Sequence, residues 1–163
     1  MTFNYHSTIY GAGPTGLVTA LALSQKKYNC CLIDPKTEDI ILSRKRAYAI
    51  TQSSRRLLED LDIWSELSPK LSPFNNLKII DVRFNQIVSL DHTDLTNNNR
   101  NVSVIGWIID HQSLMEVLFH KVNQCPYIHS YIGIDISPDK FLSKFEIAAD
   151  GPSSYNRNRK EIG

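Results

Sequence analysis

Residues 7–16 read Ser-Thr-Ile-Tyr-Gly-Ala-Gly-Pro-Thr-Gly, a short apolar stretch that runs directly into the spacing Gly-x-Gly-x-x-Gly. A segment rich in alanine and leucine follows with helical periodicity, and a second apolar stretch ends at Asp34. This glycine spacing is informative when it lies between a strand and a helix, with an acid after the next strand. The order therefore predicts a βαβ unit that binds a dinucleotide.

The three glycines of the spacing have separate tasks in this interpretation. Gly11 permits the tight turn, Gly13 lets the backbone approach a diphosphate, and Gly16 lets the helix pack close to the strand. The first peptide N–H groups of the helix and the positive end of its dipole would hold the phosphate charge. Asp34 would accept hydrogen bonds from a ribose. A turn with a structural role alone is the other interpretation of these residues.

Composition and charge narrow the class of protein. The 163 residues are 42% hydrophobic and 21% charged, which is ordinary for a globular domain. The net charge of +1 gives no reason to expect nucleic acid or an anionic membrane as a partner. The three cysteines and five histidines lack the spacing of a disulfide framework or a metal site, so we expect no metal. Without a pattern for a secretory signal or a membrane span, we expect a cytoplasmic protein, and peripheral membrane contact stays open.

The first part of the chain is expected to alternate strands with helices. The expected elements are a strand over 6–10, a helix over 15–26, a strand over 29–34, a loop over 36–43, and a helix from Thr51 or Ser53 to Leu61. Cys30 and Cys31 adjoin in the second strand, so they should fill apolar space on opposite faces. Residues 68–73, rich in serine and proline, are the best internal boundary.

The pattern changes after this boundary and becomes typical of antiparallel strands. The expected elements are paired strands over 77–84 and 86–90, a loop over 91–101, a strand over 102–109, a helix after Asp110, and strands over 127–136 and 141–149. The last two strands could form a hairpin, with the second one entering the parallel sheet. The expected fold class is therefore α/β, a Rossmann-like βαβ domain with part of an antiparallel sheet inserted.

Four segments, taken in order, resemble the flavoprotein aromatic hydroxylases, particularly the branch that acts in ubiquinone biosynthesis. The segments are 11–16 with Asp34, 46–50 followed by 57–64, 106–111 leading to Leu114 and Leu118, and 149–157. The last segment, Ala-Asp-Gly-Pro-Ser-Ser-Tyr-Asn-Arg, makes the resemblance specific because glycine-rich loops occur in all dinucleotide folds. In the second segment Asp62 stands where the family usually has glycine.

The resemblance implies FAD as the cofactor and a set of residues that bind it. The implied residues are Gly11, Gly13, Pro14, Thr15, Gly16, Asp34, Arg46, Gln112, Asp150 and Gly151. The glycine loop would line the pyrophosphate of FAD, and Asp34 would bind the adenosine ribose. Arg46 would lie near the flavin, and Gln112 would touch the cofactor. From the residues alone, Arg46 could instead be a surface charge.

The resemblance also assigns tasks near the end of the chain. Asp150 would bind the ribose region of FAD in a conformation that Gly151 permits, while Ser154 and Arg157 would hold this segment and meet NAD(P)H. An ordinary turn at Asp150 and Gly151 is the other interpretation, since this dipeptide is favoured in turns. His111 is expected to be a polar residue at the start of a helix rather than a general base. No catalytic residue is named.

The implied activity is that of an FAD-dependent monooxygenase that uses NAD(P)H and O₂ to hydroxylate a phenolic ring, a polyprenylated ubiquinone precursor. Residues 1–70 and 105–163 would bind FAD, and residues 71–104 would form part of the substrate-domain sheet. The resemblance covers less than half of a usual family member, so a second chain could supply the missing part. A non-catalytic FAD- or nucleotide-binding fragment that needs such a partner, or a decayed gene fragment, stays open as an alternative.

Overall fold

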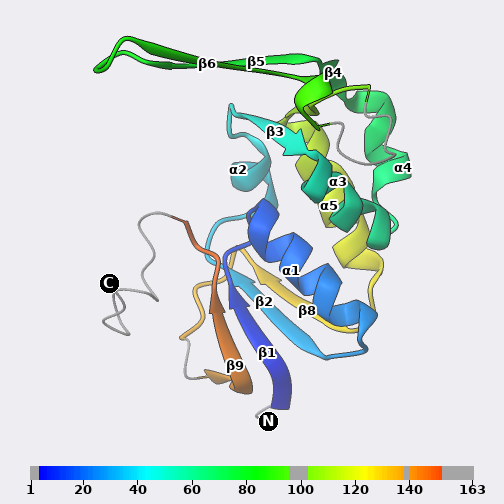
Figure 1. The fold of residues 1–163 in the computed structure, drawn as a ribbon. Helices are drawn as coiled ribbons and strands as arrows, with labels where there is room; N and C mark the ends of the chain where they lie inside the picture. Colours follow the sequence, from blue (N-terminus) through cyan, green and yellow to red (C-terminus); the bar gives the residue numbers. More distant parts are fainter. Residues whose placement is uncertain (1–3, 96–102, 138–139, 152–163) are drawn as a thin grey trace. The chain divides into compact units, whose positions relative to one another are not determined.

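The computed structural model describes residues 4–95, 103–137 and 140–151. The chain divides into two compact units, one formed by residues 1–45 with 111–163 and the other by residues 46–110. Each unit has its own sheet, and the elements are labelled in Figure 1. The mixed α/β class expected from the sequence is confirmed.

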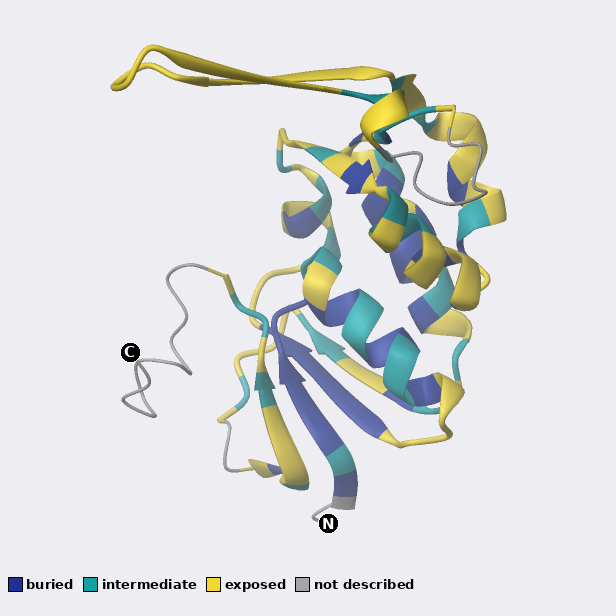
Figure 2. Cartoon of the chain, viewed as in Figure 1, coloured by how far each residue is buried: buried dark blue, intermediate teal, exposed yellow. Residues whose placement is uncertain are grey.

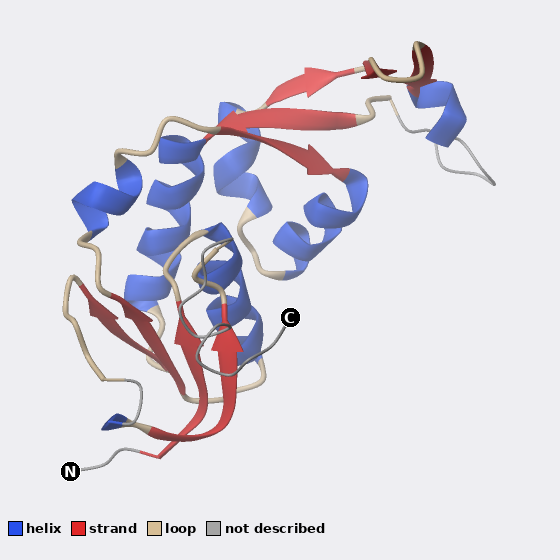
Figure 3. Cartoon of the chain, turned by 90° about the vertical axis from the view of Figure 1, so that its left-hand side faces the viewer, coloured by secondary structure: helices blue, strands red, loops and turns tan. Residues whose placement is uncertain are grey.

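The first unit is built on a four-stranded sheet with the strand order β8-β2-β1-β9. Its strands are β1 (Asn4–Tyr10), β2 (Cys30–Asp34), β8 (Ile128–Ile132) and β9 (Leu142–Ala148). All three neighbouring pairs are parallel, and the arrows in Figure 3 point the same way. The two central strands, β2 and β1, are the most deeply buried (Figure 2).

Among the described residues, three helices belong to this unit. They are α1 (Pro14–Gln25), α2 (Glu38–Leu42) and α5 (His111–Gln124). The buried residues of α1 recur every three or four positions, which places them on one face. This helix packs against β1, β2 and α5, and α5 also packs against α2 and β8. The βαβ unit predicted from the glycine spacing is therefore present.

An apolar cluster in the first unit consists of Tyr5, Tyr10, Cys31, Ile33 and Phe141, with Tyr131 and Ile136 packed against it. The rings of Tyr5 and Phe141 meet edge to face, with centroids 5.6 Å apart. The hydroxyl groups of Tyr5 and Tyr131 lie 3.3 Å apart. Burial and this hydrogen bond raise the pKa of Tyr5, so the phenol stays neutral inside the cluster.

The second unit contains a three-stranded antiparallel sheet with the order β3-β7-β4. Its strands are β3 (Ala47–Thr51), β7 (Gly106–Asp110) and β4 (Ser72–Phe74). Helices α3 (Gln52–Asp60) and α4 (Trp64–Leu67) follow β3, and short 3₁₀ turns lie at Ser68–Lys70 and His92–Leu95. The Thr51 hydroxyl accepts a hydrogen bond from the Ser54 amide and so caps α3.

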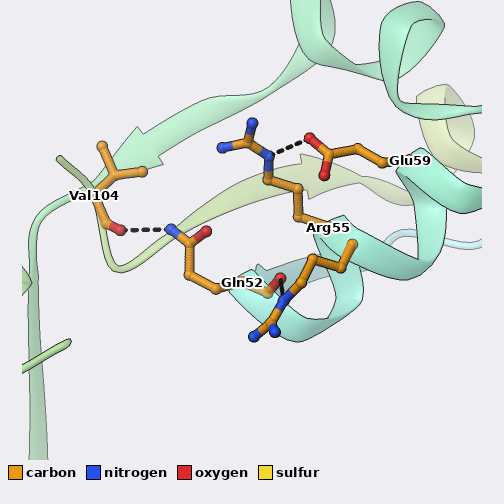
Figure 4. Close-up of polar contacts among 5 residues, drawn as sticks. Gln52, Arg55, Glu59 and Val104 are labelled. Carbon is orange, nitrogen blue, oxygen red and sulfur yellow. Dashed lines mark hydrogen bonds and ion pairs between the residues drawn. The ribbon is translucent and has the colours of Figure 1, made fainter. Parts of the chain in front are cut away.

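Polar contacts, drawn in Figure 4, and aromatic contacts hold α3 in this unit. The Gln52 side-chain amide donates to the Val104 carbonyl oxygen at 2.7 Å, and Arg55 Nε donates to Glu59 Oε1 at 2.7 Å. The Arg55 guanidinium lies 5.2 Å from the Trp64 ring centroid and 5.3 Å from that of Trp107. The two indoles meet at 74° with centroids 4.9 Å apart, so they pack against each other.

Strands β5 (Asn76–Asp81) and β6 (Gln86–Asp91) form a two-stranded hairpin. The register pairs Leu77 with Leu90 and Ile79 with Val88, which places these four apolar side chains on one face. Almost the whole hairpin is exposed (Figure 2), including Val82 near the turn at 87%. The described residues thus leave an apolar sheet face open to solvent.

Three expectations about local structure are wrong. Residues 36–43 contain α2 rather than only a loop, because Thr37 and the acids Glu38 and Asp39 form a suitable helix start. The expected strands after residue 126 form no hairpin, because β8 pairs with β2 while β9 pairs with β1. The strand expected over 102–109 is shorter and begins at Gly106. The turn expected at residues 137–139 lies partly outside the described residues.

Candidate functional site

The loop that joins β1 to α1 lies at the carboxyl edge of the parallel sheet, the usual ligand-binding edge of such folds. The Gly11 amide donates to the Ile33 carbonyl oxygen at 2.7 Å. The Ala149 amide donates to the Tyr10 carbonyl oxygen at 2.7 Å. These two bonds bring the ends of three adjacent strands together around the glycine loop.

Gly11 lies where a side chain cannot be accommodated. Its φ is +105°, in the region that favours glycine, and a Cβ atom there would lie 2.4 Å from the Ala149 carbonyl oxygen. Gly16, in the first turn of α1, is just as restricted, since its Cβ atom would lie 1.8 Å from the Gly11 carbonyl oxygen. Both glycines are therefore needed for the close packing of the loop, β9 and α1.

Gly13 differs from the other two glycines because space lies open beside it. No described atom lies within 4 Å of the position that its Cβ atom would occupy. It is the N-cap of α1, and no described side chain caps this helix end. Pro14 occupies the first helical position, Thr15 is exposed, and the first turn contains no acid. The open backbone at a bare helix N-terminus fits a negatively charged diphosphate.

Asp34 ends β2 beside this loop and is buried, with 7% of its surface exposed. Its Oδ2 accepts a hydrogen bond from the Ala12 amide at 2.8 Å, and its Oδ1 accepts one from the Lys36 amide at 2.9 Å. A buried carboxylate is tolerated when such donors replace water. The contact with Ala12 is a feature that sequence reasoning missed, although the acid after the second strand pointed to Asp34 itself.

The turn after β9 adjoins the same loop. Asp150 is half-buried, and its backbone nitrogen would lie 2.7 Å from a Cβ atom on Gly11. Gly151 is exposed with a φ of +93°, which favours glycine. The structure thus places the 11–16 loop, Asp34, Asp150 and Gly151 at one edge of the first unit. Ser154 and Arg157, expected to extend this segment, lie outside the described residues.

The two other expected cofactor residues, Arg46 and Gln112, are exposed. Gln112 is exposed on α5, where its side-chain amide donates to Glu116 Oε1 at 2.9 Å. Arg46 belongs to the second unit, where it is exposed immediately before β3.

His111 is 1% exposed at the start of α5, and its Nε2 lies 2.7 Å from the Ile41 carbonyl oxygen. A carbonyl oxygen only accepts, so Nε2 carries the proton and donates it to this bond. This contact ties α5 to α2.

Within residues 4–95, 103–137 and 140–151, no group of three or more His, Cys, Asp or Glu side chains could hold a metal ion. In the same ranges, no helix is long and apolar enough to cross a membrane.

Comparison with known proteins gives the family. Residues 4–105 match the family described as FAD binding domain. An uncharacterized protein of Synechocystis sp. is 26% identical over 168 residues, which cover 92% of this chain and 39% of that protein. The p-nitrophenol 4-monooxygenase PnpA of Pseudomonas putida has a similar fold, with a TM-score of 0.76 and 15% identity over 98% of this chain and 44% of its own.

A second solved structure with a similar fold is that of the flavin-dependent monooxygenase PieE in complex with FAD and substrate. Its TM-score is 0.74 and its identity 17%, over 99% of this chain and 32% of its own. The chain thus spans less than half the length of each of these three proteins. Over more than half of its length it matches one family, and it belongs to the FAD binding domain family.

Proposed function

We propose that this chain binds FAD at the edge formed by the 11–16 loop, Asp34 and the Asp150 turn, as the cofactor-binding part of an aromatic monooxygenase. The observation that carries the proposal is the open backbone at Gly13, beside a helix N-terminus without an acid or a side-chain cap. The match to the FAD binding domain family supports the choice of FAD over other dinucleotides.

Each residue of this edge has a task toward the cofactor in the proposal. The N–H groups of the first turn of α1 bind the pyrophosphate, and Gly13 with Pro14 and Thr15 forms the surface on which it rests. Asp34 accepts hydrogen bonds from the adenosine ribose, as acids at this position do in dinucleotide folds. Asp150 and Gly151 hold the ribose region from the neighbouring strand. Bound in this way, FAD would supply the redox and oxygen chemistry of the reaction.

Arg46 and Gln112 complete the proposed set of cofactor residues. Arg46 carries a permanent positive charge and is exposed, so it is available to a phosphate or to the flavin. Gln112 uses one of its two side-chain N–H donors on Glu116, so the other donor and the side-chain oxygen would be open to the cofactor. These two assignments rest on the family resemblance of their segments.

The proposed reaction is hydroxylation of a phenolic ring, with NAD(P)H as the reductant and a polyprenylated ubiquinone precursor as the substrate. In this proposal residues 1–70 and 105–163 bind FAD, and residues 71–104 form part of the sheet that faces the substrate. The exposed apolar face of β5 and β6 supports the last assignment, because it is suited to a covering layer or an apolar ligand.

A non-catalytic FAD-binding component that works with a partner chain is the second candidate. It is favoured by the same exposed face, with Ile79 and Val88 both 53% exposed. Water must be excluded for a monooxygenase to avoid releasing its oxygen as peroxide. A partner that covers this face and the flavin would meet that need.

The first experiment is reconstitution of the purified chain with FAD, followed by desalting. We expect retained yellow colour and a change of flavin fluorescence for the wild type. The matched variant is Gly13→Val, whose side chain would fill the open approach to the helix N-terminus. The backbone at residue 13 is extended, with a φ of −75°, and is accessible to valine. Loss of flavin from the variant alone supports the site, and a wild-type chain that retains no flavin contradicts the proposal.

The second experiment separates the two candidates. NAD(P)H oxidation and product formation are measured with a phenolic substrate and the flavin-loaded chain. Hydroxylated product from the chain alone supports the monooxygenase. Flavin binding without product, and product only after a partner polypeptide is added, supports the component that needs a partner.

A further inference from the structure

We propose that Asp34 is a positioning residue that organises the glycine loop before any cofactor arrives. The observation is the pair of hydrogen bonds that its carboxylate accepts, from Ala12 in the loop and from Lys36 beyond β2. One buried side chain thus joins the loop to the strand end. The inference rests on the proposed FAD site for its functional meaning, but both contacts join groups of the chain itself.

The end of β2 holds two consecutive loop residues. The Ile33 carbonyl oxygen accepts a hydrogen bond from the Gly11 amide at 2.7 Å, and the Asp34 carboxylate accepts one from the Ala12 amide at 2.8 Å. Hydrogen bonds to an ionised acceptor are roughly twice as strong as neutral ones. The two bonds therefore fix the register of the loop against β2, where the first bond alone would leave Ala12 free to rotate.

This arrangement also decides which amides can face a phosphate. The Ala12 N–H points at Asp34, so it is not a donor to the cofactor. Pro14 has no N–H group. The donors left in this region are those of Gly13, Thr15 and Gly16, which belong to the cap and first turn of α1. The pyrophosphate should consequently rest on the helix turn and not on the preceding tip of the loop.

Positioning by Asp34 is compatible with a contact to ribose. Each carboxylate oxygen has two lone pairs and uses one of them for an amide. The remaining lone pairs are open to ribose hydroxyl groups, so the loop need not rearrange when the ligand binds. A carboxylate that only recognised ribose would have no effect on the loop in the absence of ligand.

Amide hydrogen exchange of the FAD-free chain, followed by NMR, tests this inference. In the wild type we expect the Ala12 amide to exchange at least about tenfold more slowly than the Gly13 amide, because only the former has an acceptor in the folded chain. Exchange of Ala12 at the rate of an unstructured peptide would overturn the inference without any variant.

Variants then assign the protection to the side chain. Asp34→Ala should remove it and Asp34→Asn should retain part of it, because one amide oxygen can still accept. Asp39→Asn, which changes an exposed acid in α2, is the matched control and should leave Ala12 unchanged. Unchanged Ala12 protection in a folded Asp34→Ala chain would overturn the inference.

Failure of the positioning role of Asp34 is distinguishable from failure of the proposed FAD binding. A wild-type chain with a protected Ala12 that does not bind FAD keeps the positioning role and refutes the cofactor assignment. A chain that binds FAD with an unprotected Ala12 amide keeps the cofactor assignment and refutes the positioning role of Asp34. For folded Asp34→Ala and Asp34→Asn chains we expect weaker binding of FMN as well as of FAD. FMN lacks the adenosine ribose, so its weaker binding would report on the loop and not on a lost ribose contact of Asp34.

Discussion

Gly16 packs so closely against Gly11 that a Cβ atom on Gly16 would lie 1.8 Å from the Gly11 carbonyl oxygen. The neighbouring atom belongs to the backbone, so relief would require the loop or the helix to move. We expect Gly16→Ala to destabilise the chain by more than about 3 kcal/mol, as severe overpacking of a rigid site does, or to prevent folding. Urea unfolding followed by circular dichroism measures this effect.

Gly13→Ala is the matched control for this prediction. Space is open around Gly13 and its backbone is extended. Alanine there should lower the free energy of unfolding by about 1 kcal/mol or less, because alanine is a weaker N-cap residue than glycine. We nevertheless expect FAD binding to weaken, because the methyl group occupies the approach to the helix. Equal loss of stability in the two variants would contradict the separate tasks of these glycines.

Sequence reasoning was sufficient for the framework of this edge but not for its hydrogen bonds. The glycine spacing predicted the turn and the helix, since only glycine fits such close contacts and the spacing is specific. It did not predict that Asp34 binds the Ala12 amide, because this bond depends on the direction of the side chain at the end of β2. The direction of a side chain is determined by tertiary packing and not by the spacing of residues in the sequence.

Arg55 connects Glu59 on its own helix with the two indoles of the second unit. The ion pair is exposed, at 39% and 40% for the two side chains, so it should contribute only about 0.3–0.5 kcal/mol. Contacts of the guanidinium with Trp64 and Trp107 should add about 0.5–1 kcal/mol each. We therefore expect Arg55→Ala to lower the free energy of unfolding by about 1–2 kcal/mol, measured by urea titration.

Glu59→Gln separates the two contributions. It removes the ion pair and leaves both aromatic contacts, so its cost should stay below about 0.5 kcal/mol. If Glu59→Gln were as destabilising as Arg55→Ala, the indole contacts would contribute nothing measurable. Tryptophan fluorescence should shift in Arg55→Ala and not in Glu59→Gln.

The hairpin of β5 and β6 offers a prediction about its surface. Ile79 and Val88 pair across the strands and are each 53% exposed, so this face should bind an apolar dye. Replacing both with threonine keeps the β-branched shape and should lower the fluorescence of bound anilinonaphthalene sulfonate. Lys78→Thr, on the other face, is the control and should leave dye binding unchanged, whereas an equal decrease would place the dye elsewhere.

Strand order was the part of the fold that sequence patterns determined least. Residues 127–136 and 141–149 were correctly expected to be extended, but their closeness in sequence suggested a hairpin. In the structure β8 lies beside β2 and β9 beside β1, so both add to the parallel sheet. Helix α2 was missed because five residues are too few to display a helical period.

The hydrogen bond from His111 Nε2 to the Ile41 carbonyl oxygen is buried, so its loss should be costly. In His111→Leu the side chain has a similar size but is apolar, so the Ile41 carbonyl oxygen loses this donor. We expect a loss of about 1–3 kcal/mol in the free energy of unfolding. The control His120→Leu changes an exposed histidine of the same helix and should cost less than about 0.5 kcal/mol. Similar losses in both variants would contradict a structural role for the His111 contact.

Cys30 and Cys31 are fully buried on the two faces of β2, which gives the chain a predictable dependence on pH. Burial, with a smaller contribution from a neighbouring thiol, raises the pKa of Cys30 from 9.0 to about 11 and that of Cys31 to about 12. The unfolded chain therefore releases these protons from about pH 9 upward, while the folded chain retains them.

Because the unfolded state binds fewer protons in this range, the free energy of unfolding should fall as the pH rises from about 9 to 11. Each thiol contributes a slope of at most about 1.4 kcal/mol per pH unit. Urea unfolding at pH 7.5, 9.0 and 10.5 measures this slope. The double variant Cys30→Ala and Cys31→Ala should show a shallower decrease than the wild type, and Cys125→Ala, at a half-buried position, should match the wild type. A double variant with the wild-type slope would show that other groups control the decrease, since all tyrosines and lysines are shared by the three chains.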